Sequence, residues 1–145
     1  MRILGLDIGD RRIGVALSDP MEVLASALTV IERKGDDSDF EAVKSLVDEN
    51  RAGLIVVGLP RLMSGDIGTQ ARKTEAFIER LRERVAVPVE VSDERLSTDV
   101  AEQLLRDAGK TPRQIKGKLD AAAAALILQW YLDRRMPERE YGEEE

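Results

Sequence analysis

Residues Met1–Ser18, MRILGLDIGDRRIGVALS, constrain the fold of this chain more than any other stretch. The apolar run Ile3–Leu6 leads into Asp7, a turn that contains Gly9 follows, and a second apolar run covers Ile13–Leu17. Two short apolar runs on either side of a Gly-containing turn are typical of two strands joined by a hairpin. This pattern predicts a carboxylate, Asp7, at the point where the first strand ends.

The rest of the chain continues with strand and helix patterns in turn. The predicted strands cover 1–8, 12–18, 24–32, 54–58 and 88–91, and the last of these runs out at 92–94. The predicted helices cover 39–50, capped by Ser38 or Asp39, and 69–85. A further helix, capped by Ser97 or Thr98, ends at 108, and the last helix covers 120–135. Short turns suit antiparallel neighbours, whereas helical crossovers suit parallel ones. The order therefore predicts an α/β fold with a mixed five-stranded sheet. The first three strands form an antiparallel meander, the fourth and fifth are parallel, and helices cover both faces.

The length of 145 residues fits one domain of ordinary size. We expect that domain over 1–137, followed by an acidic, disordered tail over 138–145. The sequence shows neither a secretory signal nor an apolar stretch of the roughly 20 residues that a membrane span needs. We therefore expect a cytoplasmic protein without a membrane partner.

Two absences from the composition limit the chemistry. The chain has no Cys, which excludes thiolate nucleophiles, cysteine zinc sites and disulfides. It also has no His, so the commonest general base and transition-metal ligand are missing. An enzyme of this composition works with carboxylates, hydroxyls, Lys and Arg, and its oxygen ligands suit a hard ion such as Mg²⁺ or Mn²⁺.

Three acids fall at predicted element ends that the fold would bring to one edge of the sheet. Asp7 ends the first strand, Glu94 follows the fifth, and Asp120 begins the last helix. Each alone has a plain structural explanation, as a turn residue, an exposed ion-pair partner and a helix cap respectively. Together they would repel one another unless a cation lay between them. Bound to one or two Mg²⁺ or Mn²⁺ ions, such a set can hydrolyse a phosphodiester.

Basic residues surround these acids, although the formal net charge of the chain is −6. Clustered basic side chains around an acidic centre are compatible with a nucleic-acid substrate, either structured RNA or branched DNA. An ordinary mixed-charge surface explains any one cluster equally well. The candidates for contact with the phosphate backbone are Arg11, Arg12, Arg95, Lys116 and Lys118.

The aromatic residues are few, and three of them fall on apolar helix faces. We expect Phe40, Phe77 and Trp130 to lie in the core, which leaves little role for base stacking on aromatic rings. The last helix is apolar nearly all round. This leaves deep burial and a homodimer contact as the two interpretations of its surface.

Five motifs in order closely resemble the YqgF family, also called RuvX or pre-16S rRNA nucleases, which are relatives of the RuvC Holliday-junction resolvases. They are LGLDIGDRRIGVALSD at 4–19, IVVGLP at 55–60, SGDIGTQA at 64–71, DERLST at 93–98 and LDAAAAALIL from 119. The resemblance implies an RNase H-like fold and a nuclease that depends on Mg²⁺ or Mn²⁺. It implies that Asp7, Glu94 and Asp120 are the catalytic and metal-binding acids. It also implies a role at the 5′ end of the small-subunit rRNA precursor, or, as for some relatives, in junction resolution.

The sequence departs from the RuvC pattern at two positions. RuvC carries a glutamate on its fourth strand, where this chain has Val57-Gly58, so Glu94 must supply that carboxylate and Asp93 is its rival. RuvC also has a second acid on its last helix, where this chain has Ala123. These losses leave open a non-catalytic module that binds nucleic acid or a protein. A sugar-kinase or actin-like ATPase is a further alternative, but such proteins need two lobes and this chain supplies one.

Overall fold

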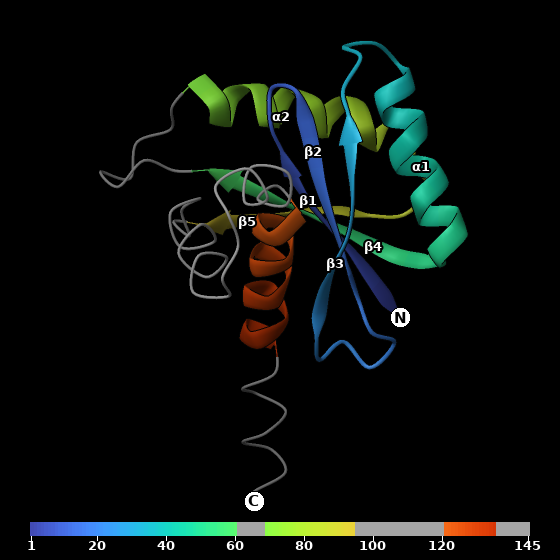
Figure 1. Cartoon of the computed structure of the whole chain (residues 1–145), viewed down its shortest axis with the longest axis vertical. Coiled ribbons are helices and arrows are strands. Elements are labelled where there is room, and N and C mark those ends of the chain that lie inside the picture. The colour runs from blue at the N-terminus through green and yellow to red at the C-terminus, as the bar shows by residue number, and fades with distance from the viewer. Residues whose placement is uncertain (61–68, 95–120, 136–145) are drawn as a thin grey trace, which may run out of the picture.

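The computed structural model describes residues 1–60, 69–94 and 121–135. Five strands form one sheet (Figure 1): β1 (Arg2–Ile8), β2 (Arg12–Ser18), β3 (Ala25–Glu32), β4 (Ala52–Pro60) and β5 (Val89–Glu94). The helices are α1 (Ser38–Asn50), α2 (Thr69–Arg82) and the C-terminal helical segment, residues 121–135. Among the described helices, none has the length and apolar character that crossing a membrane requires.

The strand order is β3-β2-β1-β4-β5, which puts β1 at the centre. β1 pairs antiparallel with β2, and β2 pairs antiparallel with β3, whereas β4 is parallel to both β1 and β5. The predicted meander followed by parallel crossovers is therefore confirmed. Because β1, β4 and β5 run in the same direction, their ends share one edge of the sheet, here called the C-terminal edge.

A separate apolar core covers each face of the sheet. On one face, Leu6, Val15 and Val57 pack with Val43 of α1 and Phe77 of α2. The other face buries a smaller cluster against the C-terminal helical segment, with Ile3, Ala16, Leu54, Val56, Ala124, Leu128 and Leu132 as its buried members. Figure 1 shows α1 and α2 together on one side of the sheet and the orange segment 121–135 on the other. The prediction of helices on both faces is confirmed.

The C-terminal helical segment runs antiparallel to β1. Ala124 and Leu128 lie directly over Gly5, where an added Cβ would approach Ala124 O to 3.3 Å and Leu128 Cβ to 2.8 Å. Further along the helix, Leu132 packs in the cluster that contains Ile3, nearer the start of β1. The first residues of the segment, from Ala121, therefore lie toward the C-terminal edge of the sheet.

Several element boundaries differ from those that the sequence predicts. β4 continues to Pro60 instead of ending at Gly58, because its parallel pairing with β5 extends to the partners Pro60 and Glu94. α2 ends at Arg82, since the next amides close a turn on Leu81 O. The predicted helix capped by Ser97 or Thr98 and the tail 138–145 lie outside the described residues.

The start of α1 also differs from the prediction. The N-cap is Asp37 rather than Ser38 or Asp39, and Ser38 is the first residue of the helix. Asp36 Oδ1 accepts the Ser38 amide at 2.9 Å, whereas the Asp39 side chain turns back to the chain before the helix. Asp39 is only 2% exposed, so it acts within the fold and not as a solvent-facing cap.

The prediction for the aromatic residues is right for Phe40 and Phe77 and wrong for Trp130. The two phenylalanines are buried and stacked, with ring centroids 4.6 Å apart. Trp130 is 44% exposed, and the Arg134 guanidinium lies 5.3 Å from its ring centroid. The physical reason is helical geometry. Leu128 faces the sheet, and Trp130 lies two residues further on, which is about half a helical turn, so Trp130 points away from the sheet.

Tyr131 links the C-terminal helical segment to β5 and provides a pH prediction. Burial raises the pKa of Tyr131 to about 12, and the hydrogen bond that its hydroxyl donates to Glu90 adds to this shift. Because the folded chain holds the phenol proton more tightly, this contact contributes stability below about pH 10 that is lost as the pH rises further. We expect ultraviolet titration to show a tyrosine ionising near pH 12, absent in Tyr131→Phe and shifted down in Glu90→Gln. Ionisation of Tyr131 at the ordinary tyrosine pKa would contradict this.

Candidate active site

Asp7 lies at the C-terminal edge, on the face of the sheet that the C-terminal helical segment covers. Along β1, Leu4, Leu6 and Ile8 point into the core under α1 and α2. Gly5 faces Leu128 of the helical segment, so strand alternation places Asp7 on the same face as Gly5. The Asp7 residue is half-buried and pairs with Gly14 of β2. The sequence prediction that a carboxylate stands where the first strand ends is confirmed.

Gly58 of β4 stands beside Asp7 and explains why this strand carries no acid. Leu6 pairs with Val57, and Gly58 pairs with Ser92, so Asp7, Gly58 and Ser92 form one row across the sheet. An added Cβ at Gly58 would clash with Ile127, whose Cγ1 and Cγ2 atoms would lie only 3.0 and 3.1 Å away. The helix therefore occupies the place of a side chain at position 58. The carboxylates of this site must come from other elements.

The second predicted acid, Glu94, is the last residue of β5 and pairs with Pro60, while its rival Asp93 pairs with Leu59. Both lie at the same edge as Asp7, but their side chains are outside the described part of the structure. Asp120, Arg95, Lys116 and Lys118 also lie outside the described residues. The structure thus brings Asp7 and the backbone of Glu94 to one edge and leaves the position of Asp120 as a prediction.

Ser92 is a residue of this row that the sequence reasoning missed. Its side chain is on β5, across Gly58 from Asp7, and the residue is only 3% exposed. Adjacent strands are about 4.8 Å apart, so the two residues are separated by about 10 Å. The sequence signal that could have identified Ser92 is its position two residues before Glu94, because alternate residues of a strand lie on the same face of the sheet.

The turn between β1 and β2 holds two of the predicted nucleic-acid contacts in different environments. The Gly9 amide donates to Arg12 O at 2.8 Å, and a Cβ at Gly9 would meet that same oxygen at 2.8 Å. Arg11 is exposed, whereas Arg12 is half-buried and its Nε lies 3.2 Å from Glu32 Oε1. Arg11 is therefore accessible to a phosphate, while the Arg12 guanidinium shares its donors between Glu32 and any phosphate that approaches.

A partly buried ion pair between Arg33 and Asp39 supports this turn, and no pattern in the sequence indicates it. Arg33 Nη1 donates to Gly9 O at 2.7 Å, and the Arg33 amide donates to Arg11 O at 2.8 Å. The guanidinium is held in turn by Asp39, with Nε 3.5 Å from Oδ2. Asp39 also accepts the amides of Lys34 at 2.8 Å and Gly35 at 3.1 Å. These bonds connect the turn that follows Asp7 to α1.

We expect Asp39→Ala to lower the free energy of unfolding by about 2–3 kcal/mol. The substitution would remove the acceptor of two backbone amides and of Arg33 Nε at a partly buried position, leaving the guanidinium only its bond to Gly9 O. Denaturant unfolding measures this, with Asp48→Ala, an exposed acid on the same helix, as the control. The control should change stability by no more than about 0.5 kcal/mol. Equal losses in the two variants would show that the Asp39 contacts contribute nothing particular.

The donor atoms available at the C-terminal edge fit a hard divalent cation. The chain has no His or Cys, so the candidate ligands Asp7, Glu94, Asp120 and Asp93 offer oxygen atoms only. Among the residues whose side chains are described, no three acids converge on one point. A metal centre therefore requires carboxylates from β5 and from the start of the last helix in addition to Asp7.

Comparisons with known proteins agree with this geometry. The family model "RuvX: Holliday junction resolvase" matches residues 1–134. A protein from Halothermothrix orenii is 47% identical over 92% of this chain and 95% of its own length, and its name is "Putative pre-16S rRNA nuclease". A protein of the same name from Thermoanaerobacter pseudethanolicus is 44% identical over 92% of this chain and 96% of its own length.

The solved structures give an independent comparison of the fold. T. thermophilus RuvC, in complex with a Holliday junction substrate, superposes with a TM-score of 0.55 at 15% sequence identity. The match covers 94% of this chain and 96% of that one. This similarity confirms the predicted RNase H-like fold. Together, the family model and the relatives show that the chain belongs to the RuvX family.

Proposed function

We propose that this chain is a divalent-metal-dependent nuclease that hydrolyses phosphodiester bonds at the C-terminal edge of the sheet. The observation that carries the proposal is the position of Asp7, at the end of the central strand and on the face covered by the C-terminal helical segment. That helix runs antiparallel to β1, and Ala121, bonded directly to Asp120, lies at its described start. β5 ends at this edge with Glu94.

Asp7, Glu94 and Asp120 would hold one or two Mg²⁺ or Mn²⁺ ions. Such an ion supplies the positive charge that activates a water and stabilises the leaving oxygen. Strand parity favours Glu94 over Asp93 as the second ligand. Positions 90 and 94 fall on the same face of β5, and Glu90 accepts a hydrogen bond from Tyr131 of the C-terminal helical segment. Position 93 falls on the other face, with Val89, which belongs to the core under α1 and α2. Asp7, Glu94 and Asp120 would hold the ion, while Ile127 fills the space where a fourth carboxylate on β4 would start at position 58.

The nucleic-acid substrate would contact basic side chains around these acids. Arg11 is exposed in the turn two residues beyond Gly9, and Arg12 is next to it. We propose that both contact the phosphate backbone of the substrate, together with Arg95, Lys116 and Lys118. Because such contacts are electrostatic, binding should weaken as salt concentration rises.

The substrate that we propose is the 16S rRNA precursor, on the basis of the relatives' names. We place the cleavage at its 5′ end because the family resemblance implies it. The family model favours a second candidate, a four-way DNA junction, because its description is Holliday junction resolvase. Either activity belongs to a cytoplasmic protein, and a homodimer would suit the two-fold symmetry of a junction.

A cleavage assay separates these candidates. The wild-type chain is incubated with RNA that spans the 5′ boundary of 16S rRNA, and separately with a four-way DNA junction, in Mg²⁺, Mn²⁺ or EDTA. We expect cleavage of the RNA in Mg²⁺ or Mn²⁺ and none in EDTA. Cleavage of the junction alone would show that the chain is a junction resolvase and not an rRNA-processing nuclease. No cleavage of either substrate would overturn the nuclease and leave a module that only binds.

A further inference from the structure

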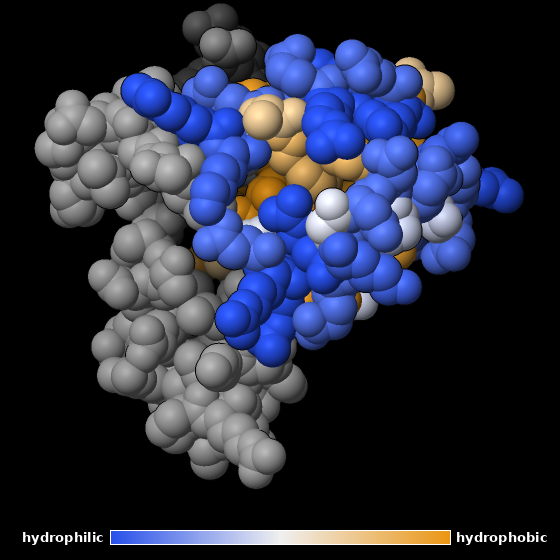
Figure 2. Space-filling view, turned by 90° about the horizontal axis from the view of Figure 1, so that it is seen from above, coloured by the Kyte–Doolittle hydropathy of each residue, from blue (hydrophilic) through white to orange (hydrophobic). Residues whose placement is uncertain are grey.

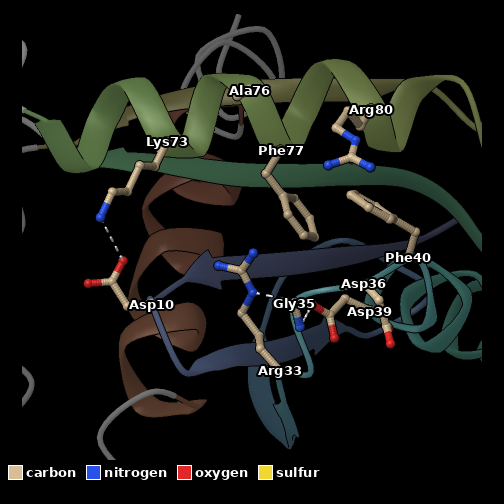
Figure 3. Close-up of a pocket in the computed structure, with 10 residues that line it drawn as sticks. All are labelled: Asp10, Arg33, Gly35, Asp36, Asp39, Phe40, Lys73, Ala76, Phe77 and Arg80. Atoms are coloured by element: carbon tan, nitrogen blue, oxygen red, sulfur yellow. Dashed lines mark hydrogen bonds and ion pairs between the residues drawn. The ribbon is translucent and has the colours of Figure 1, made fainter.

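A pocket of about 350 Å³ lies between α2, the start of α1 and the β1–β2 turn. Figure 3 shows Lys73 and Ala76 of α2 above the pocket, Asp10 and Arg33 below it, and Phe77 pointing into it. Seen from above, this end of the molecule has hydrophobic atoms at the bottom of a hollow that hydrophilic residues surround (Figure 2). The pocket has a partly apolar floor and a polar rim.

The pocket lies at the same edge of the sheet as Asp7, although on the α1–α2 side. Asp10, which lines it, follows Asp7 by three residues, so their Cα atoms are at most about 11 Å apart. Arg33, which also lines it, donates to Gly9 O at 2.7 Å. A nucleic-acid strand that crosses the C-terminal edge at Asp7 can therefore reach the pocket with a neighbouring nucleotide.

One wall of the pocket is held rigidly before any ligand arrives. The Arg33 guanidinium lies 5.2 Å from the centroid of Phe77, and Phe77 is stacked on Phe40. Gly9 O and Asp39 fix the orientation of the guanidinium. The result is a planar cation on an aromatic support, a surface on which a flat ring can stack. A preformed surface lowers the entropy cost of binding.

The charges around the pocket favour a base over a phosphate. Of the described residues that line it, the three cations are balanced by three carboxylates: Arg33, Lys73 and Arg80 against Asp10, Asp36 and Asp39. A neutral set of this kind attracts an anion weakly. It offers both hydrogen-bond donors and acceptors, as the edges of a nucleobase require.

The rim of the pocket contains an exposed ion pair that a ligand can replace. Lys73 Nζ lies 3.5 Å from Asp10 Oδ1, and both side chains are largely exposed. Exposed ion pairs contribute little to stability, so a ligand can separate this pair at little cost. Lys73 and Asp10 could then hydrogen-bond a base from two elements, α2 and the β1–β2 turn.

We propose that this pocket binds one unpaired base of the nucleic-acid substrate, adjacent to the bond that is cleaved. The proposal rests on the proposed nuclease function only for the identity of the ligand as nucleic acid. The volume of the pocket falls within the range of ligand pockets, about 300–1,000 Å³. Recognition of single-stranded nucleic acid commonly uses bases that are splayed out and stacked on aromatic or guanidinium planes.

Binding of abasic probes tests this without cleavage. Fluorescein-labelled single-stranded RNA and DNA oligonucleotides of one sequence are titrated with the full chain in EDTA, and each nucleotide in turn is replaced by an abasic site. We expect one abasic position to weaken wild-type binding about five- to tenfold, the size of a single stacking contact. Because the pocket is neutral, that loss should be similar at low and high salt.

The variant Ala76→Phe fills the pocket from the exposed surface of α2, and Ala86→Phe makes the same change at an exposed alanine that does not line it. We expect Ala76→Phe to bind the intact probe about five- to tenfold more weakly and to show no further loss at the abasic position. Ala86→Phe should behave as wild type. Circular dichroism confirms that both variants are folded.

Two results would overturn the proposal in distinguishable ways. If the wild-type chain binds the probes but no abasic position weakens binding, or if Ala76→Phe remains sensitive to that position, the pocket does not hold a base and the nuclease proposal stands. If the wild-type chain binds neither RNA nor DNA, the base pocket is overturned, and the cleavage assay above decides the nuclease proposal separately.

Discussion

Asp7→Asn is expected to reduce metal-dependent cleavage on the order of 10³-fold while the chain remains folded. The amide keeps the shape of the side chain but removes a negative charge at the end of β1. A metal ion contributes several kcal/mol to the stabilisation of the transition state, and each 1.4 kcal/mol lost is a factor of ten in rate. Initial rates in Mn²⁺ measure the effect.

The matched control is Asp48→Asn, an exposed acid on α1 that is far from the C-terminal edge. It removes the same charge from the chain and should cleave at the wild-type rate. Thermal unfolding of both variants checks that a lost rate does not reflect a lost fold. Cleavage by Asp7→Asn at the wild-type rate in every metal condition would refute the assignment of Asp7.

Gly5→Ala is expected to lower the free energy of unfolding by about 1–3 kcal/mol, the cost of overpacking a core. A Cβ at this position would lie 2.8 Å from Leu128 Cβ and 3.3 Å from Ala124 O. Neither atom is the end of a flexible side chain, so the whole C-terminal helical segment must shift. Because Asp120 precedes that segment directly, we also expect cleavage to fall.

Gly53→Ala is the control on β4, in the same sheet. There a new Cβ would meet Met1 Sδ at 2.6 Å, but Met1 is 55% exposed and its side chain can move away. We expect a change within about 0.5 kcal/mol. Denaturant unfolding compares the two variants. A similar small effect in both would show that the helix does not depend on close contact at Gly5.

Much of the fold could be predicted from the sequence because its local patterns are strong. The two apolar runs on either side of Asp7 and the apolar run Leu54–Val57 are typical of buried strands in a mixed sheet. The errors occurred where tertiary contacts decide. β4 extends past its predicted end at Gly58 to Pro60 because β5 pairs beside it as far as Glu94, which no local pattern indicates. Trp130 looked like a core residue, but burial depends on which side of the helix faces the sheet.

The candidate site was predicted only in part, for similar reasons. Asp7 could be located because it ends a clear apolar run. The role of Gly58 could not, since the clash with Ile127 involves residues far apart in the chain. Likewise, the contact of Arg33 with Gly9 and Asp39 depends on how β3 meets α1. Sequence spacing alone contains no information on such contacts.

The most direct test of the metal centre is anomalous diffraction from a crystal of the full chain soaked in Mn²⁺. The account predicts an anomalous peak at coordination distance from the carboxylates of Asp7, Glu94 and Asp120, at the edge where β1 and β5 end. A peak elsewhere, or coordinates in which these three carboxylates are too far apart to share one ion, would contradict it.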